Sequence, residues 1–171
     1  IGTNTDAAGF YAALGDTNLA GAPVTVIGSG GAARAVLFAL SRIGVGPVTI
    51  LARSPLKGAA LLALFGLKGD ALPIPAVAPP AALLVNATTL GMVGQPPLDL
   101  DLGALPDDAV VYDIVYAPLE TPLLKAARKR DLATIDGLEM LVGQAAVAFE
   151  LFFDAAPPRD RDDELRALLT S

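Results

Sequence analysis

Residues 24–33, with the sequence Val-Thr-Val-Ile-Gly-Ser-Gly-Gly-Ala-Ala, decide the fold of this chain. The first four residues are apolar or β-branched and predict a short buried strand, and residues 32–43 predict a helix rich in alanine and leucine. Between them, Gly28, Gly30 and Ala33 fit the fingerprint Gly-x-Gly-x-x-(Gly/Ala). Because the fingerprint stands in the strand–turn–helix context that it requires, it indicates a nucleotide-binding site.

Each small residue of this fingerprint has its own task. Gly28 allows a tight turn, Gly30 leaves the backbone open to a pyrophosphate, and Ala33 lets the helix lie close to the strand. The phosphates would lie on the free N–H groups at the positive end of the helix. The alternative interpretation is a glycine-rich turn between two buried elements that binds no ligand.

Composition excludes several classes of protein. The 171 residues suit one domain, and 53% of them are hydrophobic, which is enough for a sizeable core. The sequence has neither cysteine nor histidine, which excludes disulfides, thiolate or histidine catalysis, and zinc sites built on those residues, so no metal site is predicted. The net charge of −6 argues against binding to nucleic acid or anionic membranes. Because we find neither a signal peptide nor a membrane span, we expect a cytoplasmic protein.

Strands and helices are predicted to alternate along the chain. The pattern predicts, in order, a helix ending at 14, a strand within 21–28, a helix over 32–43, a strand over 48–52, a helix over 55–65, an edge strand within 69–80, strands over 83–87 and 109–116, a helix over 123–130, a strand over 132–135, a helix over 138–153 and a short helix over 165–169. Such alternation implies a parallel sheet with right-handed crossovers. We therefore predict a Rossmann-like, doubly wound α/β domain with helices on both faces of the sheet.

Two segments fit this scheme less simply. Residues 94–106 carry no helix or strand signal and are predicted to be a loop. The helix predicted over 138–153 is apolar nearly all round, so it should be buried or covered.

The end of the second predicted strand bears on the choice of cofactor. Enzymes that bind NAD place an acidic residue about 20 residues after the glycines, to hold the ribose hydroxyls. Here that position holds Arg53, with Lys57 four residues later and no acid between them. A guanidinium can bind a 2′-phosphate through two hydrogen bonds, so the sequence favours NADP. The alternative is a solvated arginine at a strand end.

Three polar groups have both a structural and a functional interpretation. Thr88 follows the strand predicted over 83–87, at the edge of a parallel sheet where ligands bind. Gln144 lies inside an apolar helix, where it makes either an interhelix hydrogen bond or a substrate contact. Asp6 is by pattern alone only an acid in the first turn of a helix.

Five motifs stand together in one order along the chain. They are Gly-Thr-Asn-Thr-Asp at 2–6, Gly-Ser-Gly-Gly-Ala-Ala-Arg at 28–34, Asn-Ala-Thr-Thr-Leu-Gly-Met at 86–92, Tyr-Ala-Pro-Leu-Glu-Thr-Pro-Leu-Leu at 116–124 and Gly-Leu-Glu-Met-Leu-Val-Gly-Gln-Ala at 137–145. Together they resemble the shikimate dehydrogenase family over nearly the whole chain. The resemblance implies reversible reduction of 3-dehydroshikimate to shikimate with NADPH, a step in aromatic amino acid biosynthesis.

The resemblance also implies roles for individual residues. Asp6 would contact a substrate hydroxyl and help to set the catalytic proton relay, and Tyr116 and Gln144 would reach the substrate. The residues implied to bind the cofactor are Gly28, Ser29, Gly30, Gly31 and Ala32 at the pyrophosphate, Arg53, Ser54 and Lys57 at the 2′-phosphate, Asn86, Ala87 and Thr88 along the groove, and Ile114, Gly137 and Met140 beside the nicotinamide. Ala52 departs from the family, which usually has asparagine before the arginine, and this weakens the contacts to the adenosine.

A larger departure concerns domain organisation. In the family, a substrate domain of about a hundred residues precedes the Asn-Thr-Asp motif and carries the catalytic lysine and a Ser-x-Ser pair. We therefore interpret residues 1–171 as an NADP-binding domain that is inactive alone. Residues 1–20 would form a hinge and linking helix, 21–137 the Rossmann-like core, and 138–171 the C-terminal helices that pack towards a substrate domain.

Two other functions remain open at this point. The chain could be a nucleotide-binding module without catalysis, although such a module has no need of Asp6 and Gln144 near the nicotinamide. It could also belong to a quinate dehydrogenase, many of which use NAD, which Arg53 disfavours. The expected partners are a small-molecule substrate and, as one possibility, a second copy of the chain in a homodimer.

Overall fold

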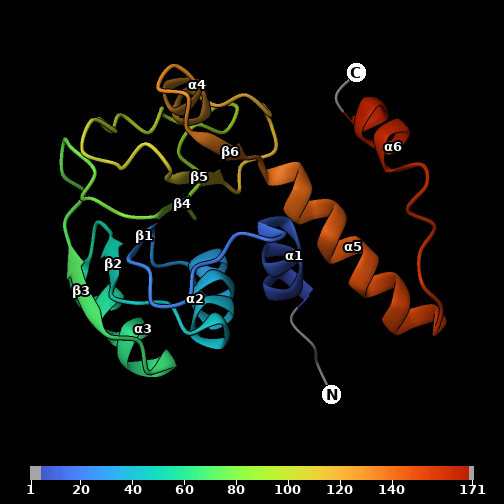
Figure 1. Cartoon of the computed structure of the whole chain (residues 1–171), viewed down its shortest axis with the longest axis horizontal. Helices are drawn as coiled ribbons and strands as arrows, with labels where there is room; N and C mark the ends of the chain where they lie inside the picture. The colour runs from blue at the N-terminus through green and yellow to red at the C-terminus, as the bar shows by residue number, and fades with distance from the viewer. Residues whose placement is uncertain (1–4, 170–171) are drawn as a thin grey trace.

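A six-stranded parallel sheet forms the centre of the molecule. The computed structural model describes residues 5–169. Its strands are β1 (Val24–Ile27), β2 (Val48–Leu51), β3 (Gly69–Leu72), β4 (Leu83–Asn86), β5 (Val110–Asp113) and β6 (Ala133–Ile135). They lie in the order β3-β2-β1-β4-β5-β6, and every neighbouring pair is parallel (Figure 1). This is the strand order of a Rossmann fold, so the predicted fold class and the predicted edge strand are both confirmed.

Six helices accompany the sheet. They are α1 (Thr5–Leu14), α2 (Gly31–Ile43), α3 (Pro55–Phe65), α4 (Pro122–Arg128), α5 (Gly137–Phe153) and α6 (Asp162–Leu169). Two of them begin with a side-chain cap of the kind that stabilises helix starts, since Thr121 accepts a hydrogen bond from the N–H of Leu124, and Asp136 accepts from Leu138 and Glu139. The predicted elements are thus all present, with shifts of a few residues at their ends.

Strand β5 is shorter than the predicted strand over 109–116. The side chain of Asp113 accepts a hydrogen bond from the N–H of Val115 at 3.1 Å, which turns the chain out of the sheet. Its neighbour β6 ends one residue earlier in the register, at Ile135, which pairs with Tyr112. The local hydrogen bond of an aspartate competes here with continued strand pairing.

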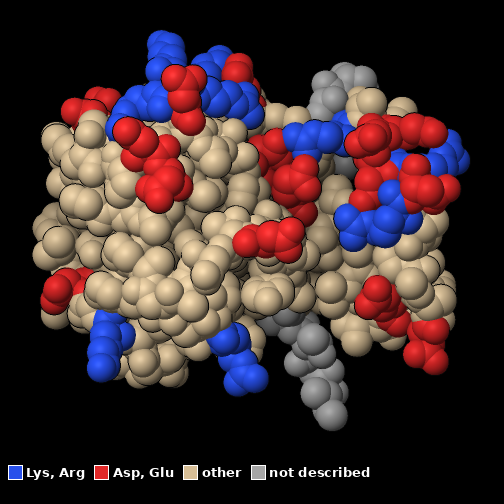
Figure 2. Space-filling view, in the orientation of Figure 1, with Lys and Arg blue, Asp and Glu red and all other residues tan. Residues whose placement is uncertain are grey.

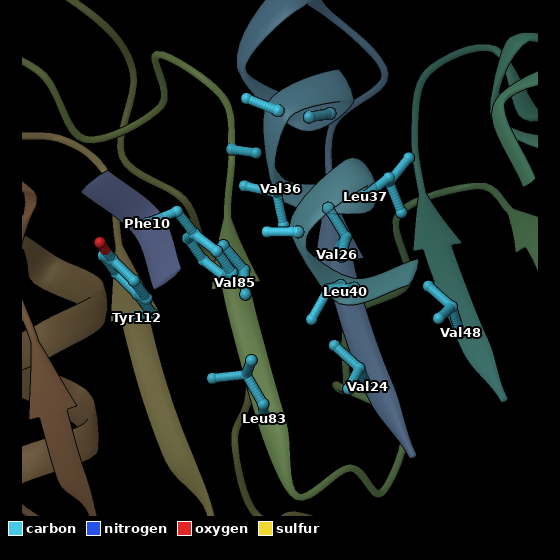
Figure 3. Packing of buried hydrophobic residues seen from close by; sticks show 14 of the residues in the cluster. Phe10, Val24, Val26, Val36, Leu37, Leu40, Val48, Leu83, Val85 and Tyr112 are labelled. Atoms are coloured by element: carbon cyan, nitrogen blue, oxygen red, sulfur yellow. The ribbon is translucent and has the colours of Figure 1, made fainter. Parts of the chain in front are cut away.

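Alternating strand residues divide the core between the two faces of the sheet. Val24 and Val26 of β1 and Leu83 and Val85 of β4 pack against α2 on one face (Figure 3). On the opposite face, the neighbouring strand residues pack with α4. Helices therefore lie on both faces, as predicted, with α1, α2 and α3 on one face and α4 on the other (Figure 1).

The face that carries α4 is covered largely by extended chain. Among the described residues, the connections from β3 to β4 and from β4 to β5 contain no helix. The segment predicted as a loop, 94–106, instead buries four leucines in the core, namely Leu98, Leu100, Leu102 and Leu105. Arg130 holds this segment through hydrogen bonds from its guanidinium to the carbonyls of Leu102 and Leu105. The prediction of a loop was correct, but no residue pattern indicated that the loop forms a core layer.

Helix α5 is buried over its first half only. Gly9 of α1 and Gly143 of α5 meet where the helices cross, because a Cβ on Gly143 would lie 3.1 Å from the Cα of Gly9. Beyond that crossing, α5 extends away from the sheet (Figure 1), and Leu151, Phe152 and Phe153 are 58%, 83% and 65% exposed. The expectation that this helix is covered is confirmed at its start and is wrong for its end within the described residues.

Helix α6 begins three residues earlier than predicted. Its first turn contains Asp162, Asp163 and Glu164, which the partial positive charge of a helix N-terminus stabilises. The helix returns to the start of α5, where Arg166 forms ion pairs with Asp136 and Glu139. Figure 2 shows acidic and basic side chains gathered together over α6.

One buried polar atom in the core is left without a partner. The rings of Phe10 and Tyr112 stack with their centroids 4.9 Å apart and 7° between their planes (Figure 3). The hydroxyl of Tyr112 is fully buried and has no hydrogen-bond partner among the residues that the structure describes. Burial raises the pKa of Tyr112 above its ordinary value, so the hydroxyl stays neutral at physiological pH.

Replacing Tyr112 by phenylalanine should leave the free energy of unfolding unchanged or raise it by up to ~1 kcal/mol. The variant keeps the stacked ring and removes a buried hydroxyl whose desolvation is not offset. Thermal and denaturant unfolding measure the change, with Tyr11→Phe, at a tyrosine that is 61% exposed, as the control. A clear loss of stability in Tyr112→Phe would mean that the hydroxyl is hydrogen-bonded in solution.

Candidate cofactor and substrate site

The strand register places the glycine turn against the loop that follows β4. Ile27 pairs with Asn86, so Gly28 lies beside Ala87 at the point where the strand order reverses direction. Gly28 has φ +113°, and a Cβ added to it would lie 2.8 Å from the carbonyl oxygen of Ala87 and 2.9 Å from Cγ2 of Thr88. Only glycine fits this turn, as predicted, and the carboxyl ends of β1 and β4 form the crevice where Rossmann folds bind ligands.

Open space lies above the first turn of α2. Gly30 caps this helix with φ −91° and ψ −162°, and no heavy atom lies within 4 Å of a Cβ added to Gly30 or Gly31. Among the described residues, Gly30 at the cap position offers no side-chain hydrogen bond to the first N–H groups of the helix, so a ligand can take that place. Ser29 and Ala32 are half-buried on either side, and Ala33 is fully buried under the helix. The turn therefore has the room and the donors that a pyrophosphate requires.

Three predicted contacts to a 2′-phosphate gather at the start of α3. Ser54 occupies the cap position, yet its hydroxyl makes no capping hydrogen bond. Arg53 and Lys57 are exposed, and neither forms an ion pair within residues 5–169. Ala52 lies just before them and is held by a hydrogen bond from its N–H to the carbonyl of Leu72. Two cations and a hydroxyl are thus available together beyond the end of β2.

Asn86 uses its whole amide within the protein. Its Nδ2 donates to Oδ1 of Asp113 at 2.9 Å and to the carbonyl of Leu90 at 3.0 Å. Its Oδ1 accepts from the N–H of Thr88 at 3.1 Å and from the hydroxyl of Thr88 at 2.7 Å. Since Asn86 is also fully buried, its side chain shapes the loop that contains Ala87 and Thr88 and has no donor left for a cofactor.

Asp113 is a buried carboxylate beside this amide. Its Oδ1 accepts from Asn86 and from the N–H of Val115, and its Oδ2 accepts from the hydroxyl of Thr121 at 2.7 Å. Burial raises the pKa of Asp113, while the hydrogen bonds from Thr121, Val115 and Asn86 act in the opposite direction. All three partners donate, which is the arrangement that an ionised carboxylate requires.

The residues predicted beside the nicotinamide lie where β5 meets α5. A Cβ on Gly137 would overlap the carbonyl oxygen of Ile114, so only glycine allows this close approach. The N–H of Gly137 donates to the carbonyl of Val115 at 3.3 Å. Met140 lies one turn further along α5 and is buried in the core beside α1, at 8% exposure. The first turn of α5 is thereby held against the end of β5.

Helices α1 and α5 carry two of the predicted substrate contacts. A Cβ on Gly9 would lie 2.6 Å from the carbonyl oxygen of Met140 and 2.7 Å from the backbone nitrogen of Gln144, so Gln144 lies at the helix crossing. Asp6, one turn before Gly9 on α1, is half-buried. The rest of its motif, residues 2–4, lies outside the described residues. Tyr116 follows β5 and is 56% exposed.

Other kinds of site are not found in the described part of the chain. Over residues 5–169, no helix is both long and apolar enough to cross a membrane. Over the same range, no cluster of three acidic, histidine or cysteine side chains could hold a metal ion.

Asp113 and Thr121 belong to this site, although neither was predicted as one of its residues. Thr121 lies within the motif at 116–124, and Asp113 lies within the strand predicted over 109–116. The available signal was an acid at the end of a buried strand, where a charge needs partners. Its pairing with Asn86 depends on the register between β4 and β5, which residue patterns do not specify.

Comparisons with known proteins agree with this geometry. Residues 137–162 match the family model described as the shikimate 5′-dehydrogenase C-terminal domain. A shikimate dehydrogenase (NADP(+)) from Sphingopyxis alaskensis is 68% identical over all 171 residues of this chain. The chain belongs to the shikimate dehydrogenase family. It spans 62% of the length of that relative, so the match covers only part of the longer protein.

Solved structures of this family share the fold. Shikimate 5-dehydrogenase from Thermus thermophilus, solved in complex with NADP(H) and shikimate, has a TM-score of 0.83 and 38% identity, covering 98% of this chain and 63% of that one. Quinate dehydrogenase from Corynebacterium glutamicum, solved in complex with NAD, has a TM-score of 0.81 and 33% identity, covering 94% of this chain and 60% of that one. These two similar structures were thus solved with different nicotinamide cofactors.

Proposed function

We propose that this chain is the NADP(H)-binding part of a shikimate dehydrogenase, which reversibly reduces 3-dehydroshikimate to shikimate. The observation that carries the proposal is the open space over Gly30 and Gly31 at the N-terminus of α2, next to the switch point of the sheet. A pyrophosphate placed there would accept hydrogen bonds from the N–H groups at the start of the helix. The choice of NADP and shikimate as ligands is supported by a relative named shikimate dehydrogenase (NADP(+)) and by a similar structure solved with NADP(H) and shikimate.

The cofactor, when bound, supplies hydride transfer to or from the substrate carbon. The protein's own residues hold the two reactants and handle the proton. Arg53, Ser54 and Lys57 would bind the 2′-phosphate, and the loops of Ala87–Thr88 and Ile114 would border the nicotinamide. Asp6, Gln144 and Tyr116 would hold hydroxyls of the substrate, and Asp6 would help to organise proton transfer to the carbonyl oxygen.

Arg53→Ala should lower the affinity for NADPH and leave the affinity for NADH unchanged. Loss of a charge-assisted, two-pronged contact to the 2′-phosphate should raise the Kd for NADPH by about 10- to 100-fold. Fluorescence titration with both cofactors measures the effect. Arg42→Ala, at an exposed arginine in the last turn of α2, is the matched control. Equal affinity of the unsubstituted chain for NADPH and NADH would contradict a role for Arg53 in cofactor choice.

A quinate dehydrogenase is the nearest alternative, because a family structure of that name binds NAD. Arg53 and Lys57 favour a cofactor with a 2′-phosphate instead. A nucleotide-binding module without catalysis is less well supported, since such a module does not require an acid and an amide on adjacent helices at the nicotinamide side. Shikimate-dependent reduction of NADP by a longer form of the protein, with and without Asp6→Asn, separates an enzyme from a binding module. Only an enzyme has a turnover that the substitution can lower.

The end of α5, in the segment 138–171 that we expected to contact a substrate domain, has an uncovered apolar surface. Leu151, Phe152 and Phe153 at the end of α5 are exposed, and the relatives are longer than this chain. We propose that this surface contacts a substrate domain, which would correspond to the part of the longer relatives that this chain does not match. A homodimer would cover the same surface with a second copy of the chain. Sedimentation of the chain alone and of a longer form distinguishes the two, because only the homodimer contact should persist in the longer form.

A further inference from the structure

We propose that Asp113 is a positioning residue that aligns the nicotinamide side of the cofactor site by fixing the loops after β4 and β5. This inference rests on the proposed function, since it concerns the same site. Asp113 is fully buried at the end of β5 and pairs in register with Asn86 at the end of β4. A buried charge at this place needs a reason, because burial of a carboxylate is costly unless its partners are all in place.

Each hydrogen bond that the Asp113 side chain makes with the described residues is donated to its carboxylate by a neighbouring group. The hydroxyl of Thr121 accepts from the N–H of Leu124 and donates its proton to Asp113. On the other side, the hydroxyl of Thr88 accepts from the N–H of Leu90 and donates to Oδ1 of Asn86. Each hydroxyl proton is therefore committed to one acceptor.

Asp113 also fixes the orientation of the Asn86 amide. A flipped amide would turn its oxygen towards the carboxylate and its NH₂ towards the N–H of Thr88, so two pairs of like groups would face one another. The negative charge of Asp113 therefore strengthens the orientation in which Oδ1 of Asn86 faces Thr88, an orientation that the carbonyl of Leu90 and the N–H of Thr88 also require. Without that charge, only the carbonyl of Leu90 and the groups of Thr88 select the observed orientation, so the amide and its loop are held less firmly.

The two loops held in this way are the walls of the nicotinamide side. Asn86 binds the backbone of Thr88 and Leu90, and Thr88 in turn lies against the turn at Gly28. Asp113 itself holds the N–H of Val115, whose carbonyl accepts from Gly137 at the start of α5. The residues proposed for the 2′-phosphate stand apart from this network, because they lie at the start of α3 beyond β2.

Asp113→Asn tests whether the network supports the nicotinamide side of the site and not the 2′-phosphate side. The variant keeps the shape of the side chain and removes the charge that orients Asn86. The Kd for NADPH should rise about tenfold, the order expected when hydrogen bonds to a charged group that hold the loops of the site are weakened. The Kd for adenosine 2′,5′-bisphosphate, which lacks the nicotinamide half, should stay within about twofold of its original value. Asp101→Asn is the matched control, because Asp101 also accepts a backbone hydrogen bond, from Gly103, in an exposed loop.

Amide hydrogen exchange supplies a second measurement. In Asp113→Asn, protection should fall at Thr88, Leu90 and Val115 and remain at Gly28, whose N–H is bonded to the carbonyl of Leu51. If that variant does not fold, Thr121→Val removes one donor to Asp113, keeps the side-chain shape, and should raise the Kd for NADPH about threefold with the same selectivity.

The outcomes separate this inference from the proposed function. An equal loss of affinity for both ligands, or no loss for either, would overturn the positioning role of Asp113. Failure of the unsubstituted chain to bind either ligand would instead overturn the proposed function, and the inference would fall with it. A selective loss for NADPH with local loss of protection supports both.

Discussion

Replacing Gly30 by valine should abolish NADPH binding while the fold stays intact. The pyrophosphate would occupy the open space beside Gly30, which a branched side chain would fill. Because φ −91° and ψ −162° suit valine and no atom lies within 4 Å of the new Cβ, the folded chain has room for the substitution. The free energy of unfolding should fall by no more than about 1 kcal/mol, the scale of a lost helix-cap preference.

Circular dichroism, thermal unfolding and cofactor titration on the same sample test this expectation. Gly28→Ala is the informative contrast, since its φ of +113° and its contacts with Ala87 and Thr88 leave no room for a Cβ. That variant should lose about 1–3 kcal/mol of stability as well as binding. If Gly30→Val retained its affinity for NADPH, the glycine turn would have a structural role only.

The 171-residue chain alone should bind NADPH but should not oxidise shikimate at a measurable rate. It contains no histidine or cysteine, and its four lysines lie on or beside α3, β3 and α4 rather than on α1 or α5, which carry Asp6 and Gln144. Lys68 immediately precedes β3, at the amino ends of the strands, and Lys125 lies on α4, where it forms an ion pair with Glu120 at 3.6 Å. Loss of a general acid alone lowers rates by roughly 10²- to 10⁴-fold, and poor positioning of the substrate adds to that loss.

A chimera supplies the comparison. The portion of the Sphingopyxis alaskensis relative that this chain does not match would be joined ahead of residue 1, and NADP reduction by shikimate would be followed in both proteins. We expect turnover only in the chimera, and Asp6→Asn in the chimera should lower kcat without changing the Kd for NADPH. Equal turnover by the chain and the chimera would show that a group within the 171 residues completes proton transfer unaided.

Residue patterns predicted the frame of this site because its parts are local. The turn at Gly28 follows directly from a buried strand and opens directly into α2, so one short stretch specifies strand, turn and helix together. Arg53 could be assigned to the cofactor's 2′-phosphate for the same reason, as it follows the next strand at a spacing that the motif sets. Every such inference joins residues that are close in sequence.

The interior of the site depends on contacts between distant segments. Asp113 and Asn86 are 27 residues apart and meet because β4 and β5 pair in one register, and a shift by one residue would turn Asp113 to the other face of the sheet. Similarly, the four leucines of 94–106 are buried because α4 alone cannot cover its face of the sheet. Neither fact has a counterpart in local spacing.

The sequence by itself therefore determined the Rossmann-like class, the glycine turn and the expected preference for a 2′-phosphate, since strand, turn and helix signals act over a few residues. Only the tertiary structure decided which polar groups are already used within the protein and which are left for a ligand. Asn86 has its amide saturated, whereas the N–H groups at Gly30 and Gly31 and the side chains of Arg53 and Lys57 remain available. Hydrogen-bond satisfaction is a property of packed neighbours, and packing brings together residues that the chain holds far apart.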